Sequence, residues 1–423
     1  MIKLSEKQIF QLSALLLAGG AILTLGIAVG ESHTWRTGYG KEIKTVFSTL
    51  ATYGEVIPEG RRHMPPDGAV RKRTHVHAPE KTVGSGYYAI SGYSEDFDGF
   101  AVWVLDSDGN LLNARNVDGN RLKNSGNAKS QGPHGMEMLP DGSVIITYDQ
   151  LGFMARLDAC GEPIWIQDGF YHHSLAPAED GGIWTWYGEG SSVVEYQYMV
   201  KFDPETGKET KRIGLIEDVI RPSKENASYF AYWQDADFRT FEEGPHDVFH
   251  PNDLEELTSD KADAFPMFET GDLLISLRTL SMVAVLGQDG TVKWARFGPW
   301  LKQHDPDFHP DGTITIYNNA FRRDHSEILA IDPATGEISP YLNRQDFPFK
   351  SEFRGKHEHM PNGNMLLTIP EQGQIFELTR DGEVVLEINN VLAKDPQWNE
   401  DVANAKWYPD DFLTEIPTCT ATE

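Results

Sequence analysis

A hairpin pattern repeated along the chain constrains the fold more than any other feature of the sequence. Short runs of β-branched and aromatic residues alternate with Asp-Gly and Pro-x-Thr-Gly turns, as in FAVWVLDSDGNLLNARNV, VAVLGQDGTVKWARF and FELTRDGEVVLEI. Such turn residues supply the backbone angles that tight β-hairpins require. Most of these hairpins follow a second pattern, in which a histidine-containing strand leads through a turn into an apolar strand. Each repeat therefore predicts four antiparallel strands.

The repeat has a period of roughly 40 residues, which is the length of one four-stranded blade of a β-propeller. The sequence therefore predicts an all-β, six-bladed β-propeller over residues 83–392, preceded by a linker (31–82) and followed by a C-terminal extension (393–423). The six units lie near residues 85–117, 132–167, 171–213, 246–298, 302–341 and 352–390, with insertions at 118–131 and 214–245.

A histidine recurs near the start of every unit except the first. The first strand of a propeller blade lines the central channel, so residues at one early position should face one cavity. His357 lies two residues away from the shared position, which keeps it on the same face of a strand. The predicted ring of imidazoles consists of His134, His173, His250, His304 and His357.

Three interpretations of this ring remain open at the level of sequence. Duplicated repeats could keep the histidines for packing, although imidazole fills apolar space poorly. A metal site would need metal–nitrogen distances of about 2.0–2.1 Å, and blades around a wide channel seldom converge so tightly. Histidine also serves as nucleophile, base and acid near neutral pH. We favour catalysis and expect no metal and no cofactor.

Two polar residues beside the histidines support a site for a small anion. Asn252 lies two residues after His250, on the same face, and its amide can donate hydrogen bonds. Arg278 ends an otherwise apolar strand, LLISLR, where a guanidinium needs an anionic partner or a route to solvent. A purely structural explanation is that Arg278 pairs with a carboxylate. If Arg278 faces the cavity, its planar fork suits phosphate or sulfate oxygens.

Charge and cysteine content exclude several classes of function. The formal net charge of −27 repels nucleic-acid phosphates, so we expect no nucleic-acid partner. The two cysteines, Cys160 and Cys419, form no CxxC pair and predict no zinc site. A single long-range disulfide between them is compatible with the sequence but is not required by it.

The first thirty residues differ from the rest of the chain. Residues 9–30 carry no charge and are long enough, at about 1.5 Å per residue, to cross a hydrocarbon core of about 30 Å. Lys3 and Lys7 precede them, which predicts a cytoplasmic N-terminus and an exported body. A cleaved signal peptide is the alternative, but its apolar region is usually only about 7–15 residues long. We expect a periplasmic protein anchored in the inner membrane by an N-terminal transmembrane helix.

The order of several segments resembles the bacterial arylsulfotransferases. These segments are HDVFHPNDLEEL, GDLLISLRTL, DGTVKWARFG, QHDPDFHPDGTITIYNN and GKHEHMPNGNMLLTI, within about residues 130–390. The resemblance implies a six-bladed periplasmic propeller that moves a sulfuryl group from one phenol to another. It also implies ping-pong transfer through a sulfohistidine, without a nucleotide sulfate donor.

The resemblance also implies roles for individual residues. His304 matches the histidine that becomes sulfated, and His250, Asn252 and Arg278 match the groups that hold the sulfuryl oxygens. His173, or His172 beside it, matches a further active-site histidine. His134 and His357 are expected to contact substrate. The implied small-molecule partners are aryl sulfates and phenols.

The chain departs from the family pattern in two places. It lacks the separate N-terminal β-domain and nearby cysteine pair of other members, and its strand after His304 ends in Tyr317-Asn318-Asn319-Ala320 rather than Asp-Asn-Gly. The alternative function is therefore a non-catalytic propeller that acts as a binding or assembly subunit of a membrane protein complex. A quinone-dependent dehydrogenase is disfavoured, because the sequence has no regular tryptophan repeat.

Overall fold

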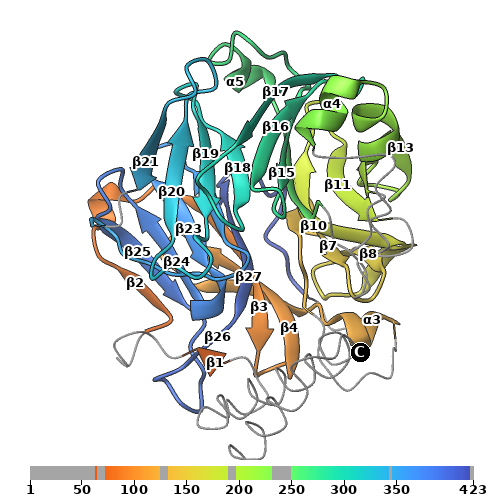
Figure 1. Cartoon of the computed structure of the whole chain (residues 1–423). Helices are drawn as coiled ribbons and strands as arrows, with labels where there is room; N and C mark the ends of the chain where they lie inside the picture. Colours follow the sequence, from red (N-terminus) through yellow and green to blue (C-terminus); the bar gives the residue numbers. More distant parts are fainter. Residues whose placement is uncertain are drawn as a thin grey trace, which may run out of the picture. The chain divides into compact units, whose positions relative to one another are not determined.

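The computed structural model describes residues 62–63, 72–123, 132–188, 197–230, 249–342 and 345–419. In this part of the chain, six antiparallel sheets with at least four strands each are arranged as blades around a common axis (Figure 1). The prediction of an all-β, six-bladed propeller is therefore confirmed.

Blades 2 to 6 each use strands that follow one another along the chain. Blade 2 comprises β6 (Met136–Met138), β7 (Val144–Tyr148), β8 (Phe153–Leu157) and β9 (Pro163–Asp168). Blade 3 comprises β10 (Phe170–Pro177), β11 (Ile183–Gly188), β12 (Gln197–Phe202) and β13 (Glu209–Gly214). Blade 4 comprises β14 (Pro251–Glu256), β15 (Leu273–Leu277), β16 (Met282–Leu286) and β17 (Val292–Phe297). Blade 5 comprises β18 (His304–Phe308), β19 (Ile314–Asn318), β20 (Glu327–Ile331) and β21 (Ile338–Leu342). Blade 6 comprises β22 (Lys356–His359), β23 (Met365–Ile369), β24 (Gln374–Leu378) and β25 (Val384–Asn389), and β2 (Thr74–Val76) pairs with β25 as a fifth strand.

Blade 1 joins the two ends of the propeller. It comprises β3 (Gly86–Ser94), β4 (Gly99–Asp106) and β5 (Leu111–Asn116), and its innermost strand is β27 (Val402–Pro409). β27 pairs antiparallel with β3, with Trp407 opposite Tyr88. The expected propeller boundary at residue 392 leaves this strand out. β27 belongs to blade 1 because it pairs with a strand about 300 residues earlier, and this pairing cannot be predicted from the local sequence.

The remaining elements are short. β1 (Arg62–His63) pairs with β26 (Asn399–Glu400). The helical elements are the 3₁₀-helices η2 (Pro79–Lys81) and η5 (Pro370–Gln372), the π-helix η3 (Leu215–Ile220), and the α-helices α3 (Gly119–Lys123), α4 (Lys224–Tyr229) and α5 (Ser259–Ala262). The predicted anchor, residues 9–30, lies outside the described residues. Within the described residues, no helix has the length and apolar character needed to cross a bilayer.

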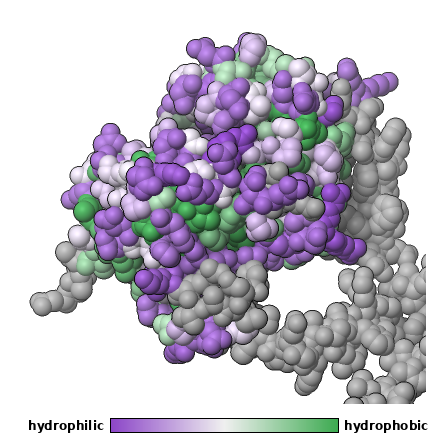
Figure 2. Space-filling view, turned by 90° about the vertical axis from the view of Figure 1, so that its left-hand side faces the viewer, coloured by the Kyte–Doolittle hydropathy of each residue, from purple (hydrophilic) through white to green (hydrophobic). Residues whose placement is uncertain are grey.

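The apolar cores lie between neighbouring blades. One cluster packs Val104 of blade 1 against Ile146 of blade 2, and another packs Val283 of blade 4 against Ile316 of blade 5. Hydrophilic residues cover much of the face seen in Figure 2, where hydrophobic residues are interspersed among them. Because apolar side chains are used between the blades, the inner strands are able to place polar residues toward the axis.

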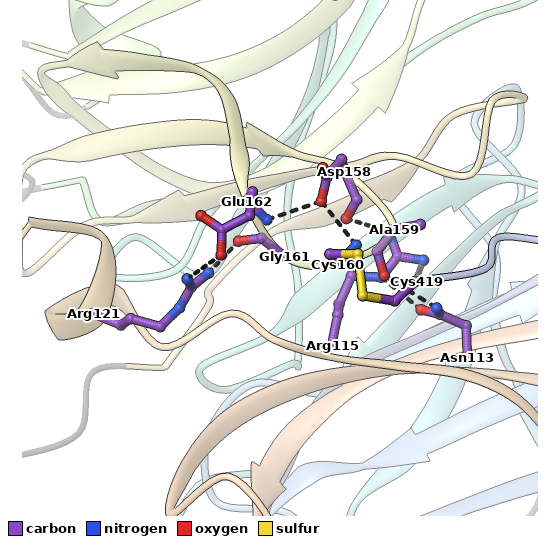
Figure 3. Close-up of a disulfide and its surroundings, with 9 residues drawn as sticks. All are labelled: Asn113, Arg115, Arg121, Asp158, Ala159, Cys160, Gly161, Glu162 and Cys419. Carbon is purple, nitrogen blue, oxygen red and sulfur yellow. Dashed lines mark hydrogen bonds and ion pairs between the residues drawn. A yellow bond between two sulfur atoms is a disulfide. The ribbon is translucent and has the colours of Figure 1, made fainter. Parts of the chain in front are cut away.

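A disulfide fastens the C-terminal segment to blade 2. Cys160, in the turn between β8 and β9, is bonded to Cys419 with the two Cα atoms 4.8 Å apart (Figure 3). Asp158 Oδ1 accepts hydrogen bonds from the backbone N–H groups of Cys160 (2.8 Å) and Glu162 (2.9 Å). Thr414 N donates to Pro140 O at 2.8 Å, so the segment after β27 contacts the same blade before it reaches the disulfide.

We expect the disulfide to stabilise the closed propeller. It links residues 259 positions apart, and restricting such a loop in the unfolded chain typically contributes about 2–4 kcal/mol. A Cys160→Ser, Cys419→Ser double variant should lower the free energy of unfolding by that amount, measured by chemical denaturation. Reductant should destabilise the wild type equally and leave the double variant unchanged. Insensitivity of the wild type to reductant would contradict the assignment.

Candidate active site

The inner strand of blade 5 is interrupted at its first residues. His304 lies opposite Tyr317 and Pro306 lies opposite Ile316, so Asp305 is an extra residue in β18. Asp305 has a φ of 50°, in the left-handed region that non-glycine residues rarely adopt. This bulge turns Asp305 away from the regular alternation of the strand and gives His304 and Asp305 separate environments.

Similar backbone outliers occur on the neighbouring blades. His173, His250 and Arg354 have φ values of 60°, 46° and 57°, and each lies at or just before an inner strand. Conformations of this kind persist where surrounding contacts impose them, and they are frequent at functional sites. Four outliers around one axis therefore indicate where a site lies.

His173 and Arg354 border a small cavity. The cavity has a volume of about 20 Å³, and its lining draws on all six blades. The lining consists of His134, His173, Ser174, Asn252, His304, Arg354, Gly355, Lys356 and Ala403. Ser174 Oγ and Asn252 Oδ1 are buried without a hydrogen-bond partner among the described residues. The cavity is therefore polar, with unused hydrogen-bonding capacity.

The hydrogen bonds of His304 fix its tautomer. Asn319 Nδ2 donates to Ser351 O (3.1 Å) and Arg354 O (2.7 Å), so Asn319 Oδ1 must be the atom that faces His304. His304 Nδ1 lies 2.7 Å from this Oδ1 and 3.0 Å from Lys302 O. Both partners accept, so Nδ1 carries the proton and Nε2 keeps its lone pair. Burial holds the pKa of His304 well below its ordinary value, and the positive charge of Arg278 lowers it further.

Blade 4 fixes the backbone on which His304 stands. Gln303 is fully buried, and its Nε2 donates to Ser276 Oγ (3.2 Å) and Met282 O (3.1 Å). Asn252 Nδ2 donates to Gln303 O at 2.7 Å. Asn252 therefore holds the peptide next to His304, and one of its two amide hydrogens is used there.

Four further histidines form a contiguous group at the cavity. The ring of His173 lies 3.9 Å from that of His134 and 5.3 Å from that of His250, measured between centroids. His172 Nε2 lies 2.8 Å from Gln197 Oε1, and the Nδ1 atoms of His172 and His173 are 2.6 Å apart. If His172 donates to Gln197, its Nδ1 accepts the Nδ1 hydrogen of His173, which leaves a lone pair on His173 Nε2. Burial lowers the pKa of His173 well below its usual value and that of His172 to about 4.

Two guanidinium groups give this region a positive potential. The backbone N–H of Arg278 donates to His250 O at 3.1 Å, and its charge acts on His304. Arg354 lines the cavity. The pKa of His134 is lowered mainly by burial, and the charge of Arg354 lowers it further. Cations around neutral imidazoles favour a small anion over a metal ion at this cavity.

A second, larger cavity of about 710 Å³ adjoins the first, and the two share Ser174 and Lys356 in their linings. Lys356 Nζ lies 2.7 Å from Asp253 Oδ1 and 2.5 Å from Asp305 Oδ1. His357 borders this second cavity, where its Nδ1 lies 3.0 Å from Asp305 Oδ2. Carboxylates therefore dominate this region, in contrast to the small cavity.

Comparison with known proteins assigns the chain to a family. The family model for arylsulfotransferase (ASST) matches residues 135–391, which is more than half of the chain. The chain belongs to the arylsulfotransferase family. No curated protein matches the sequence significantly.

Solved structures similar to this arylsulfotransferase-family protein share little sequence with it. A protein of unknown function from Bacteroides caccae is 11% identical, with 72% of this chain and 94% of that chain covered and a TM-score of 0.47. Virginiamycin B lyase from Staphylococcus aureus is 13% identical, with 66% and 84% covered and a TM-score of 0.36. A putative 6-phosphogluconolactonase from Bacteroides fragilis is 14% identical, with 79% and 86% covered and a TM-score of 0.41.

The structure brings together most of the residues expected from the arylsulfotransferase resemblance. His134, His173, Asn252 and His304 line one cavity, and His250 and Arg278 lie beside it. His357 does not join them, because Asp305 Oδ2 accepts hydrogen bonds from its backbone N–H and its Nδ1 and holds it in the acidic cavity. The expectation that His357 shares the imidazole ring is therefore wrong.

Sequence reasoning missed Arg354 and Asn319. Arg354 lies in the FRGKHEH segment, three residues before His357. The only sequence signal for its position near the axis is that this segment begins the sixth repeat. Asn319 follows β19 and coincides with the asparagine of the Asp-Asn-Gly family pattern. Ala320, at the glycine position of that pattern, has a φ of 46°. Although this segment differs from the family pattern, it retains the side-chain amide, at Asn319, and the left-handed backbone conformation, at Ala320.

We expect Lys356→Met to destabilise the protein strongly. The substitution leaves Asp253 and Asp305 buried without their shared cation, which typically costs about 3–5 kcal/mol. Chemical denaturation should report this loss, and adding Asp253→Asn should recover part of it, because one uncompensated charge is removed. Lys394→Met, at an exposed pair with Glu95, is the matched control and should change little. Equal effects at Lys356 and Lys394 would contradict a buried ion cluster.

Proposed function

We propose that this protein is an aryl-sulfate sulfotransferase that moves a sulfuryl group between phenols through a sulfohistidine at His304, without a nucleotide sulfate donor. The observation that carries the proposal is the state of His304. Its Nδ1 hydrogen is bound by Asn319 Oδ1 and Lys302 O, which leaves the Nε2 lone pair available, and the charge of Arg278 helps to keep the ring unprotonated. Membership of the arylsulfotransferase family supports the same chemistry.

In the first half-reaction, His304 Nε2 forms a bond to the sulfur of the aryl sulfate. The bond between sulfur and the phenolic oxygen breaks, and the phenolate leaves with its electron pair. The imidazole keeps its Nδ1 hydrogen, so the sulfohistidine pairs an imidazolium ring with an anionic sulfuryl group. Asn319 accepts a hydrogen bond from this Nδ1 hydrogen and so helps the ring to stay protonated there. The ring can then leave as a neutral imidazole in the second step.

In the second half-reaction, the oxygen of an acceptor phenol attacks sulfur. The nitrogen–sulfur bond breaks and its electron pair returns to Nε2 of His304. The phenolic proton must pass to a base within reach. His173 fits this role, since its Nδ1 hydrogen is directed toward His172 and its Nε2 lone pair is available.

The sulfuryl oxygens remain anionic throughout the transfer, so fixed donors near them lower the barrier. Arg278, Arg354 and His250 fit this role, and each donor of this kind contributes about 3–4 kcal/mol in related oxyanion sites. Asn252 serves as a positioning residue through its hydrogen bond to Gln303 O.

We further propose that the protein works outside the cytoplasm, held to the inner membrane by residues 9–30. The Cys160–Cys419 disulfide supports this proposal, because such bonds persist in oxidising compartments such as the bacterial periplasm. Phenols and aryl sulfates are the expected small-molecule partners, and a membrane protein complex is a further candidate partner.

We expect His304→Ala to abolish transfer and Asn319→Ala to weaken it. Loss of the nucleophile should reduce turnover of a chromogenic aryl sulfate with a phenol acceptor about 10³-fold or more. Loss of the tautomer-fixing amide should cost about 10²-fold or more. Mass spectrometry of peptides from donor-treated protein should find one SO₃ group on His304.

The control for this experiment is His325→Ala, at the surface of the same blade, where the ring pairs with Asp324. It should keep full activity. Turnover by His304→Ala equal to that of the wild type would refute the mechanism. Absence of turnover in the wild type with every aryl sulfate tested would favour a non-catalytic binding or assembly subunit.

The lowered pKa of His304 predicts an unusual pH dependence. A base whose pKa is depressed stays unprotonated below the ordinary histidine value of about 6.5. The single-turnover rate of phenolate release should therefore stay level between about pH 7.5 and about pH 5.5. Asn319→Asp should shift the loss of activity to higher pH, because a carboxylate stabilises the protonated ring. A wild-type rate that halves near pH 6.5 would contradict this assignment.

A further inference from the structure

A second group of histidines lies in the larger, acidic cavity and takes no part in the proposed transfer. His357 and His359 stand on β22 of blade 6, and Asp307 stands on β18 of blade 5. One ring nitrogen of each histidine and one carboxylate oxygen of Asp307 lie within 4.8 Å of one another. All three residues line the cavity of about 710 Å³.

Part of this group already has the spacing of a metal site. His357 Nε2 lies 3.4 Å from Asp307 Oδ2, which is close to the separation of two ligands that each lie about 2.0–2.1 Å from a tetrahedral zinc ion. Thr315 Oγ1 lies between the two rings, 2.8 Å from His357 Nε2 and 2.9 Å from His359 Nε2. A bound ion would replace the Thr315 hydroxyl as the partner of His357 Nε2.

The orientation of His357 is that of a metal ligand. Asp305 Oδ2 accepts from both the backbone N–H of His357, at 2.5 Å, and from Nδ1, at 3.0 Å. Nδ1 therefore carries the proton, and the lone pair of Nε2 is directed toward Thr315 and Asp307. Carboxylates that hold the remote nitrogen in this way are regular partners of metal-bound histidines.

Hydrogen bonding within the group leaves one buried acceptor unsatisfied. The Thr315 hydroxyl has a single hydrogen, which His357 Nε2 accepts, so His359 must donate its Nε2 hydrogen to Thr315 Oγ1. The remaining nitrogen of His359, Nδ1, is then an acceptor, and it is buried without a hydrogen-bond partner among the described residues. Unsatisfied buried groups are rare in native proteins, and a bound ion is one way in which such a group is satisfied.

The charges around the group also favour a cation. Lys356 pairs with both Asp253 and Asp305, and Lys261 pairs with Glu255 at 2.7 Å. Asp307 has no lysine or arginine ion-pair partner in the described part of the chain, and its ion pair there is with His357. A bound cation would supply the missing positive charge.

We propose that Asp307, His357 and His359 bind one divalent transition-metal ion of the zinc class at the junction of blades 5 and 6. Two imidazoles and one carboxylate select such an ion over calcium or magnesium, which prefer all-oxygen sites. The three protein ligands leave at least one coordination position open to the cavity. The ion would join β18 to β22 and so connect two blades.

The test is zinc binding by the full chain, purified in mild detergent without a histidine tag and freed of metal with a chelator. Calorimetric titration should give one Zn²⁺ per chain, with a rise in the unfolding temperature. Asp307→Asn and His359→Gln should each weaken the affinity at least about 10-fold. Bound Co²⁺ should give the visible absorption of nitrogen-ligated cobalt in the wild type and lose it in both variants.

The matched control is His309→Gln. Its ring contacts that of His359 edge to face, with the centroids 4.1 Å apart, and lines the same cavity, but its nitrogens are bonded to Tyr341 and Asp311. This variant should keep the wild-type affinity. Absence of binding to the wild type would overturn the proposal. Equal affinity in Asp307→Asn and the wild type would overturn it as well, because the metal would then be bound elsewhere, for example at the stacked pair of His75 and His77.

Discussion

The ammonium group of Lys356, held by two buried carboxylates, connects three blades and borders both cavities. It lies between Asp253 of blade 4 and Asp305 of blade 5, while Lys356 itself begins the inner strand of blade 6. Burying these charges is costly, and it is tolerated only where each one is paired. Asp305 can reach Lys356 because it is the extra residue of a bulge. The same bulge gives His304 its separate environment.

Closure of the propeller provides the frame for this cluster. β27 brings residues 402–409 back to β3, and Ala403 of that strand borders the small cavity. Cys419 then fastens the following segment to blade 2. Because apolar clusters occupy the spaces between blades, the inner strands are left to carry polar groups. The polar axis is therefore a consequence of where the hydrophobic packing is placed.

The two cavities have opposite electrostatic character although they adjoin. Arg278 and Arg354 act on neutral histidines in the first, which suits the transfer of an anionic sulfuryl group. Carboxylates of β14 and β18 surround the second, which suits a cation. Lys356 borders both cavities and pairs with Asp253 and Asp305.

The sequence by itself determined the blades, because each hairpin is a local unit whose turn residues and alternating strands are read within about 40 residues. It also determined that His134, His173 and His304 meet, since their shared offset places them on equivalent inner strands. Only the tertiary structure decided the rest. Contacts between blades hold His357 against Asp305 in the acidic cavity and join Asn319, beside His304, to the backbone of Arg354. The partner of β27 and the disulfide likewise depend on residues hundreds of positions apart, which no local pattern encodes.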